Sequence, residues 1–265
     1  MTLAEIKATL RDAGIDNFSG EAHILIKEFC RADAARPDTD FESPGLCDAV
    51  RRRAAREPLQ YILGKWGFYK EEYFVTPDCL IPRADTEVLV EALRRRAPAG
   101  GRFLDLCTGS GCIAVSLANA RPDLSGIAAD LSPAALKLAQ KNALHNGVHT
   151  LSFLEMDVTK PGDFSERFDC ICANPPYIRT AALSSLAPEL AFEPRMALDG
   201  GADGLCFYRA ILENFEKNLL PGGFFAFELG FDQRADAEAL AARYGYSLDA
   251  ITDYGGNFRA AVFTK

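Results

Sequence analysis

The fold is decided by the stretch Phe103-Leu-Asp-Leu-Cys-Thr-Gly-Ser-Gly-Cys-Ile-Ala114. Its first four residues form an apolar run that predicts a buried strand, and the residues after the turn predict a helix over 111–119. Gly109 and Gly111 permit a tight turn and let the backbone approach a ligand, while Ala114 permits close packing of the helix on the sheet. A strand, a glycine turn and a helix in this order are typical of the first unit of an open α/β sheet.

The same alternation of strand and helix continues along the chain. Further strands are expected at 126–130, 151–155, 168–173, 223–228, 246–251 and 259–264. Helices are expected at 133–146, 204–219 and 233–244, and a helix that begins at Asp85 or Thr86 precedes the first strand. This alternation predicts a parallel, doubly wound sheet. The last two strands are joined by a loop too short for a parallel crossover, so the α/β sheet should have seven strands, with the last one reversed.

The first part of the chain has a different pattern. Residues 1–72 are expected to form a small helical domain, and residues 73–265 the α/β domain. Apolar residues at helical spacing predict two helices, the second of them capped by Ser19. After a polar loop at 36–42, Ser43-Pro44 begins a third helix. Aromatic segments then predict a hairpin that joins the two domains.

Four arginines lie close together near the end of the third predicted helix: Arg51, Arg52, Arg53 and Arg56. We interpret them first as a solvated helix face, because positive charge is favourable near a helix C-terminus. Docking of a partner protein is the alternative interpretation.

The overall charge and composition exclude some classes of protein. The chain has 265 residues and a formal net charge of −8, whereas a protein that binds the nucleic-acid backbone is expected to be basic. The eight cysteines are scattered, and Cys170 and Cys172 should point to opposite faces of a strand, so we expect free thiols and no metal site. No apolar stretch is long enough to span a membrane, and the N-terminus does not resemble a signal peptide. We therefore expect a cytoplasmic monomer.

The glycine loop leaves two cofactors open. Its pattern matches the dinucleotide fingerprint, and Asp130 follows at the end of the second strand, where a carboxylate binds ribose hydroxyls. NAD and S-adenosyl-L-methionine both fit this pattern. A pyrophosphate is disfavoured by nearby carboxylates, so Asp105 and Asp157 favour the cationic cofactor, with Asp157 and Val158 beside its adenine. The alternative role for Asp105 is to order the loop by accepting backbone N–H bonds.

A second candidate site is Asn174-Pro-Pro-Tyr177, which directly follows the strand expected at 168–173. The two prolines cannot continue a strand ladder, so they predict a stiff extended turn at the edge of the sheet where ligands bind. Asn174 Oδ1 and the Pro175 carbonyl could accept the two N–H bonds of a planar amino group, with Tyr177 packed on that group. The alternative is a proline-rich turn without a chemical role.

These residues lie within longer motifs that resemble those of a known family. In chain order the motifs are Pro58-Leu-Gln-Tyr-Ile-Leu-Gly64, Ile81-Pro-Arg-Ala-Asp-Thr-Glu87, the loop after Asp105, Asn174-Pro-Pro-Tyr-Ile178 and Glu193-Pro-Arg-Met-Ala-Leu-Asp-Gly-Gly-Ala-Asp-Gly-Leu205. Together they resemble the HemK/PrmC family of protein-(glutamine-N5) methyltransferases, which act on peptide chain release factors. The resemblance covers nearly the whole chain. It implies a helical N-terminal domain that helps recognise the substrate and a class I, Rossmann-like methyltransferase domain.

The resemblance also implies roles for individual residues. S-adenosyl-L-methionine would be held by Asp130 and Asn174 together with the loop residues Cys107, Thr108, Gly109, Ser110 and Gly111. The amide of the glutamine in the release factor's Gly-Gly-Gln tripeptide would be gripped by Asn174, Pro175, Pro176 and Tyr177. Asn-Pro-Pro-Tyr alone is shared with DNA adenine methyltransferases. A nucleic-acid adenine-N6 methyltransferase, or a non-catalytic adaptor that retains the fold, is therefore the alternative.

Four positions depart from the usual pattern of the family. Cys107 stands where the family usually has glycine, and a cysteine is small enough for the loop if its φ is negative. Ala84-Asp85 replaces the usual Pro-Glu. Val158 occupies a place near the expected adenine where some members have an aromatic residue, so weaker stacking is expected there.

Overall fold

The computed structural model describes residues 1–31, 39–161 and 164–265, so part of the polar loop predicted at 36–42 lies outside the described residues. The described chain divides into two units. The first comprises Met1–Lys65 together with Ala187–Phe192, and the second comprises Trp66–Leu186 and Glu193–Lys265. The sequence placed the division after residue 72, and it gave no indication that a segment from the second half joins the first unit.

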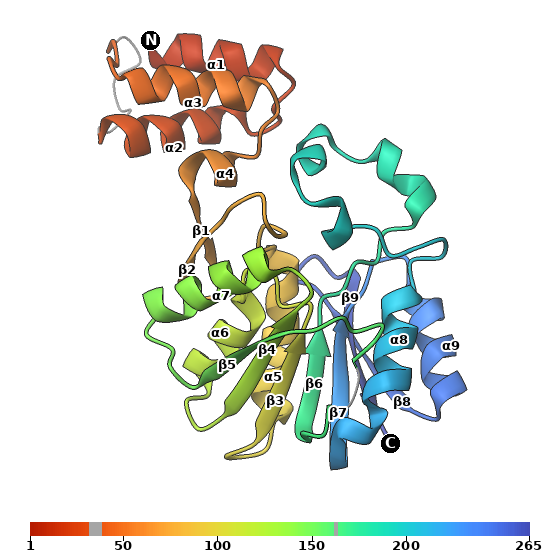
Figure 1. Ribbon diagram of the computed structural model, residues 1–265. Coiled ribbons are helices and arrows are strands. Elements are labelled where there is room, and N and C mark those ends of the chain that lie inside the picture. The colour runs from red at the N-terminus through yellow and green to blue at the C-terminus, as the bar shows by residue number, and fades with distance from the viewer. Residues whose placement is uncertain (32–38, 162–163) are drawn as a thin grey trace. The chain divides into compact units, whose positions relative to one another are not determined.

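The first unit is built from short helices (Figure 1). They are α1 (Leu3–Asp12), α2 (Phe18–Cys30), α3 (Pro44–Ala54) and α4 (Leu59–Leu63). The apolar stripes on these helices are buried against each other, as their spacing predicts. Ser19 does not cap α2, because the helix begins at Phe18, two residues earlier than predicted, and Asn17 takes the cap position. Ser43 does occupy the cap position of α3, but its hydroxyl donates to the Phe29 carbonyl at 3.2 Å instead of capping the helix.

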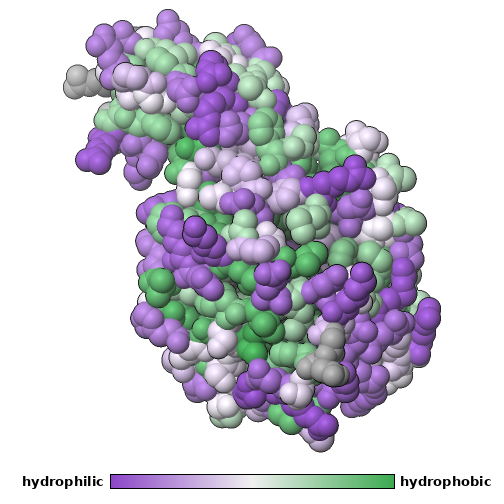
Figure 2. Space-filling view, viewed as in Figure 1, coloured by the Kyte–Doolittle hydropathy of each residue, from purple (hydrophilic) through white to green (hydrophobic). Residues whose placement is uncertain are grey.

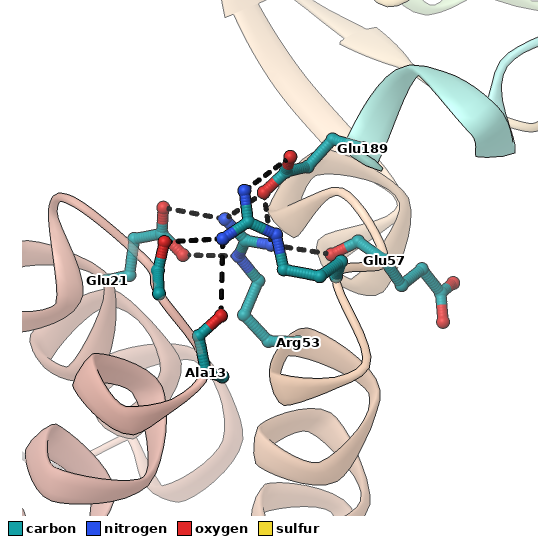
Figure 3. Close-up of polar contacts among 7 residues, drawn as sticks. Ala13, Glu21, Arg53, Glu57 and Glu189 are labelled. Atoms are coloured by element: carbon teal, nitrogen blue, oxygen red, sulfur yellow. Dashed lines mark hydrogen bonds and ion pairs between the residues drawn. The ribbon is translucent and has the colours of Figure 1, made fainter. Parts of the chain in front are cut away.

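The interpretation of the arginine cluster as a solvated face is wrong for Arg53, which is only 5% exposed. Its guanidinium donates to Glu21 Oε2 at 2.6 Å and to Glu189 Oε1 at 3.1 Å (Figure 3). Arg56 donates to the other oxygen of Glu189 at 2.8 Å. Glu189 belongs to η3 (Pro188–Phe192) in the segment that joins this unit from far along the chain. Charge pairing therefore attaches that segment to the helices.

After these helices the chain forms a hairpin and then a large sheet. The hairpin predicted from the aromatic segments is formed by β1 (Lys65–Phe68) and β2 (Glu71–Phe74). Among the described residues the large sheet has seven strands in the order β5-β4-β3-β6-β7-β9-β8. Their bounds are β3 Arg102–Leu106, β4 Ser125–Asp130, β5 Leu151–Glu155, β6 Phe168–Ala173, β7 Leu219–Glu228, β8 Ser247–Thr252 and β9 Phe258–Thr264.

The predicted reversal of the last strand is confirmed. β9 pairs antiparallel with both β7 and β8, whereas β3, β4, β5, β6 and β7 pair parallel. The reversed strand is the last in sequence but is not at the edge of the sheet, since β8 lies outside it. The carboxyl ends of β3, β4 and β6 therefore meet at one edge, and all the predicted site residues lie at the ends of these strands or directly after them or β5.

Helices cover both faces of the sheet (Figure 1). On one face α5 (Glu87–Arg96) and α6 (Cys112–Ala120) share a core cluster with Phe103. On the other face α8 (Cys206–Phe215) and α9 (Arg234–Tyr244) pack with Leu104. α7 (Pro133–His145) connects β4 to β5. Burial on both faces explains the nearly continuous apolar runs of the central strands.

Hydrophobic residues are also exposed among hydrophilic ones on the surface (Figure 2). Leu131 and Met196 are 49% and 52% exposed. Both contribute to the rim of the cavity described below. Within the described residues no helix is both long enough and apolar enough to cross a membrane.

Candidate active site

The glycine loop connects β3 to α6 and has an unusual backbone. Gly109 has φ +55° and Gly111 has φ +80°, which glycine adopts at little cost. A Cβ on Gly111 would lie 3.0 Å from Cβ of Ala139 in α7, so this glycine also permits close packing. Cys107 has φ +57°, so the condition of a negative φ, under which a cysteine would fit the loop easily, is not met. Because a Cβ crowds the backbone in this region, the cysteine is strained where glycine would not be.

Asp105 lies beneath the loop and does not line the cavity. Its side chain is fully buried and accepts from Thr108 Oγ1 at 2.5 Å, while Cys172 Sγ lies 3.6 Å from it. Burial raises the pKa of Asp105 to about 7. Of the two roles considered for this residue, the structure favours loop ordering, because the carboxyl group is enclosed by the loop that it bonds.

Asp130 ends β4 and faces the loop. Oδ2 accepts from the backbone N–H of Gly109 at 2.8 Å, and Oδ1 accepts from that of Ser132 at 2.9 Å. These bonds fix the carboxylate between the loop and the start of α7. Burial raises its pKa. The residue lines the cavity, which is the location expected for a carboxylate that binds ribose hydroxyls.

A cavity of about 330 Å³ lies at the carboxyl ends of the strands. Most of the residues predicted from sequence to bind a cofactor or substrate line it: Cys107, Thr108, Gly109, Ser110, Asp130, Asp157, Val158, Asn174 and Pro176. The structure therefore brings together residues from the ends of β3, β4, β5 and β6. Gly111 is not part of the lining, because it forms the N-cap of α6.

Asp157 and Val158 follow β5, as expected for residues beside an adenine. Asp157 accepts from the hydroxyl of Thr159 at 2.6 Å, and this bond lowers its pKa. Val158 is buried, and its carbonyl accepts from Asn214 Nδ2 at 3.0 Å. Met156 also lines the cavity and was not predicted. An apolar wall of Met156 and Val158 stands in place of an aromatic platform.

The Asn174-Pro-Pro-Tyr177 turn is held by the segment that follows η4 (Arg195–Ala197). Ile178 donates its N–H to the Leu198 carbonyl at 3.0 Å, and Gly200 donates back to the Ile178 carbonyl at 2.8 Å. A Cβ on Gly200 would lie 2.7 Å from the Pro176 carbonyl oxygen. The glycine is therefore required by a close approach of two backbones, and it fixes the position of the turn.

Tyr177 and Pro175 do not belong to the cavity lining. The Tyr177 ring is partly buried against the core on one face of the sheet, and its hydroxyl donates to Glu228 Oε1 at 3.3 Å. The expectation that this ring packs on a planar group in the cavity is therefore not supported by its position. Burial raises the pKa of Tyr177, and the nearby Glu228 carboxyl adds to the shift. Tyr177 therefore contacts the core and Glu228, and it does not line the cavity.

Glu193 is a site residue to which the sequence analysis assigned no role. It is 6% exposed, accepts from the Ile81 N–H at 3.0 Å and pairs with Arg83. It thereby joins two segments that both contribute to the cavity lining, 78–83 and 194–199. The sequence did single out both segments, because they lie in motifs that carry the family resemblance. Neither motif by itself shows that the two segments pair.

The charges of the cavity are mostly negative. Among the described lining residues, Arg83 is the cation, and it is paired with Glu193. Four carboxylates also line the cavity: Asp78, Asp130, Asp157 and Asp199. Such a lining is unfavourable for a pyrophosphate and favourable for a cationic ligand.

Two family models match this chain. The family model for the PrmC N-terminal domain matches residues 2–64, and the model for the methyltransferase small domain matches residues 83–201. The catalytic domain of hMettl16, a solved structure, superposes with a TM-score of 0.60 at 15% identity over 82% of this chain and 80% of that chain. This likeness shows a shared methyltransferase fold.

Curated relatives are much more similar in sequence. A release factor glutamine methyltransferase of Geobacter sulfurreducens is 43% identical over 246 residues, covering 89% of this chain and 86% of that protein. One of Thermodesulfovibrio yellowstonii is 41% identical over 251 residues, covering 92% and 89%. At this identity and coverage, the chain belongs to the family of release factor glutamine methyltransferases.

Proposed function

We propose that this protein transfers a methyl group from S-adenosyl-L-methionine to the side-chain amide nitrogen of the glutamine in the Gly-Gly-Gln motif of peptide chain release factors. The observation that supports this most directly is the position of Asn174. Its side chain lines the same cavity as the glycine loop and Asp130, at the carboxyl end of the adjacent strand. An amide-binding group and a cofactor loop therefore share one cavity.

The lining fits a cofactor that carries positive charge. Asp130 would bind the ribose, Asp157 and Val158 would flank the adenine, and the loop at 107–110 would approach the remainder. The four carboxylates of the lining suit an ammonium and a sulfonium better than phosphates. When bound, S-adenosyl-L-methionine supplies a methyl group on a positively charged sulfur.

Asn174 would orient the acceptor amide. An amide nitrogen is a weak nucleophile, and its N–C bond forms as the methyl–sulfur bond breaks, after which the nitrogen loses a proton to solvent. No strong base is needed, because the proton leaves from an already methylated nitrogen. Asn174 Oδ1 accepts one N–H of the substrate and holds the nitrogen in line with the methyl group, so that alignment and fixed dipoles provide the catalysis.

We propose that the helical unit contributes to substrate recognition, but not through the whole arginine cluster. Arg53 and Arg56 are occupied by Glu21 and Glu189, and Arg52 pairs with Glu57. Arg51 pairs with Asp48 and keeps an exposure of 74%. All four side chains are therefore paired within the unit, and only Arg51, which remains mostly exposed, is left as a candidate for docking a partner.

The test offers the full chain two substrates in parallel, a release factor and duplex DNA, and locates added methyl groups by mass spectrometry. We expect one methyl on the Gly-Gly-Gln glutamine. Asn174→Ala should reduce turnover by at least about 100-fold, with methyl-donor affinity measured by calorimetry changed by less than about fivefold. Asn119→Ala, on the exposed surface of α6, is the matched control and should remain fully active. Methyl groups found in DNA alone, or full activity of Asn174→Ala, would contradict the proposal.

A further inference from the structure

The direction of the Asn174 amide decides whether it can assist the reaction. Its oxygen accepts hydrogen bonds and its nitrogen donates them, so the substrate N–H is bound only if Oδ1 faces the cavity. If the side-chain amide of Asn174 were flipped, its NH₂ group would face the N–H groups of the substrate amide and repel them. Some neighbour must therefore fix one of the two orientations.

Thr86 is the neighbour within reach. Asn174 Nδ2 donates to Thr86 Oγ1 at 3.4 Å, and both residues line the cavity. Thr86 is 2% exposed. A threonine hydroxyl can both donate and accept, so it could bond either end of the asparagine amide. Thr86 alone therefore does not select the orientation, and the direction of its single hydroxyl hydrogen must itself be determined.

Glu228 determines that direction. It ends β7 and is 2% exposed, and the Thr86 hydroxyl lies close enough to lower the pKa of its carboxyl group. An ionised carboxylate only accepts hydrogen bonds, so it draws the hydroxyl hydrogen of Thr86 toward itself. Thr86 Oγ1 is then left as an acceptor, and the group that approaches it must be the Asn174 NH₂. Tyr177 donates to the same carboxylate from the other side at 3.3 Å.

The electrostatic surroundings of Glu228 include charged and titratable groups from several elements. They are Asp85 of η1 (Ala84–Thr86), Cys112 of α6, Tyr177 after β6, Tyr208 of α8 and Arg259 of β9. The Arg259 guanidinium favours the ionised form of Glu228, and burial opposes it. In the described part of the chain, Oε2 of Glu228 has no hydrogen-bond partner within normal distance. An acceptor in this environment attracts any available hydroxyl hydrogen.

Helix capping does not explain Thr86. The residue occupies the N-cap position of α5, where threonine is common, but among the described residues its side chain makes no capping hydrogen bond. Thr86 therefore stands at the predicted cap position, but its side chain does not cap the helix. Its hydroxyl oxygen accepts from Asn174 Nδ2 instead, so its role lies in the site.

We propose that Thr86 is a positioning residue that, together with Glu228, orients the side-chain amide of Asn174 so that Oδ1 faces the acceptor amide. This rests on the proposed function. Asn174 Nδ2 donates to Thr86 Oγ1, and Tyr177 donates to Glu228. The inferred link between them is the Thr86 hydroxyl hydrogen, drawn toward the Glu228 carboxylate.

The test compares Thr86→Val with Thr86→Ser at pH 8, where the Glu228 carboxyl is ionised. Valine keeps the shape of threonine without the hydroxyl, and serine keeps the hydroxyl. We expect kcat to fall at least about tenfold in Thr86→Val and to stay within about threefold of the wild type in Thr86→Ser. The melting temperature and the calorimetric affinity for the methyl donor should change little in both.

A second readout does not depend on turnover. The side-chain NH₂ signals of Asn174, assigned by their loss in Asn174→Ala, should shift in Thr86→Val and stay near their wild-type positions in Thr86→Ser. Unchanged signals and unchanged kcat in Thr86→Val would overturn the inference, as would a serine variant as impaired as the valine variant. A wild-type protein that fails to methylate the release factor contradicts the proposed function instead, while the NMR comparison still tests the orientation of Asn174.

Discussion

Glu189 accepts hydrogen bonds from Arg53 at 3.1 Å, although 136 residues separate the two in the chain. Arg53 is almost completely buried, and its positive charge is compensated by Glu189 and Glu21. Removing one member of a buried ion pair leaves the other charge uncompensated, which costs more than the pair contributes.

We therefore predict that Arg53→Ala lowers the free energy of unfolding by about 3 kcal/mol. Arg51→Ala is the matched control on the same helix. Its exposed pair with Asp48 should contribute less than about 1 kcal/mol. Urea denaturation followed by circular dichroism measures both. Equal effects of the two substitutions would contradict the role assigned to Arg53.

Gly200→Ala should impair catalysis by displacing the Asn174-Pro-Pro-Tyr177 turn. The added methyl group would lie 2.7 Å from both the Pro176 carbonyl oxygen and the Tyr177 Cα, and neither backbone atom can move without moving the turn. Overpacking of this kind costs roughly 1–3 kcal/mol. We expect kcat to fall by about tenfold or more. Gly67→Ala, where a Cβ meets nothing within 4 Å, should retain wild-type kcat and stability.

Cys107 is predicted to be a strained position. Cys107→Ala removes the thiol and keeps the Cβ, whereas Cys107→Gly removes both. Because the residue has φ +57°, the glycine variant should be more stable than the alanine variant by about 1 kcal/mol. Thermal unfolding of the two variants side by side isolates this conformational contribution. An alanine variant as stable as the glycine variant would show that the loop relaxes.

Two buried carboxyl groups should make stability fall as the pH rises. Burial raises the pKa of Asp105 and of Glu228 to about 7 in the folded protein. Unfolded carboxyl groups titrate near pH 4, so between about pH 4 and pH 7 the folded state binds more protons than the unfolded state. The contribution of each protonated group is therefore complete below about pH 4 and is lost by about pH 7.

Replacing the titrating group by a neutral one should reduce this dependence. We expect the unfolding free energy of Asp105→Asn and of Glu228→Gln to change less between pH 5 and pH 8 than that of the wild type, as measured by urea denaturation. Asp157→Asn is the control, because the Asp157 pKa is lowered in the folded protein and its contribution has the opposite sign. A slope in Glu228→Gln as steep as in the wild type would assign the pH dependence to other groups.

The elements of the α/β unit were predictable because their signals are local. Buried strands appear as apolar runs, and the glycine loop needs only the residue types that permit its turn. The reversal of the last strand followed from the length of one loop. The residues at 107–110 that we propose to hold the cofactor follow β3 directly, and Asp130 ends β4, so their position at one edge of the sheet was predictable too.

The remaining features depend on pairings between distant residues. Nothing near Arg53 indicates that Glu189 will neutralise it, and nothing in Asn174-Pro-Pro-Tyr177 indicates that the tyrosine turns away from the cavity toward Glu228. The backbone conformation of Cys107 could not be predicted for another reason. A cysteine is statistically expected at negative φ, and the loop overrides that preference at an energetic cost.

The segment at 187–192 has a consequence for how this protein can be divided and recombined. The helical unit is discontinuous in sequence, because Ala187–Phe192 is inserted from the second half of the chain. A fragment that ends at Lys65 would therefore lack Glu189 and would carry Arg53 without one of its two carboxylate partners. The N-terminal unit is thus not an interchangeable module, and a chimera that exchanges it with a relative's must exchange both pieces of the gene together.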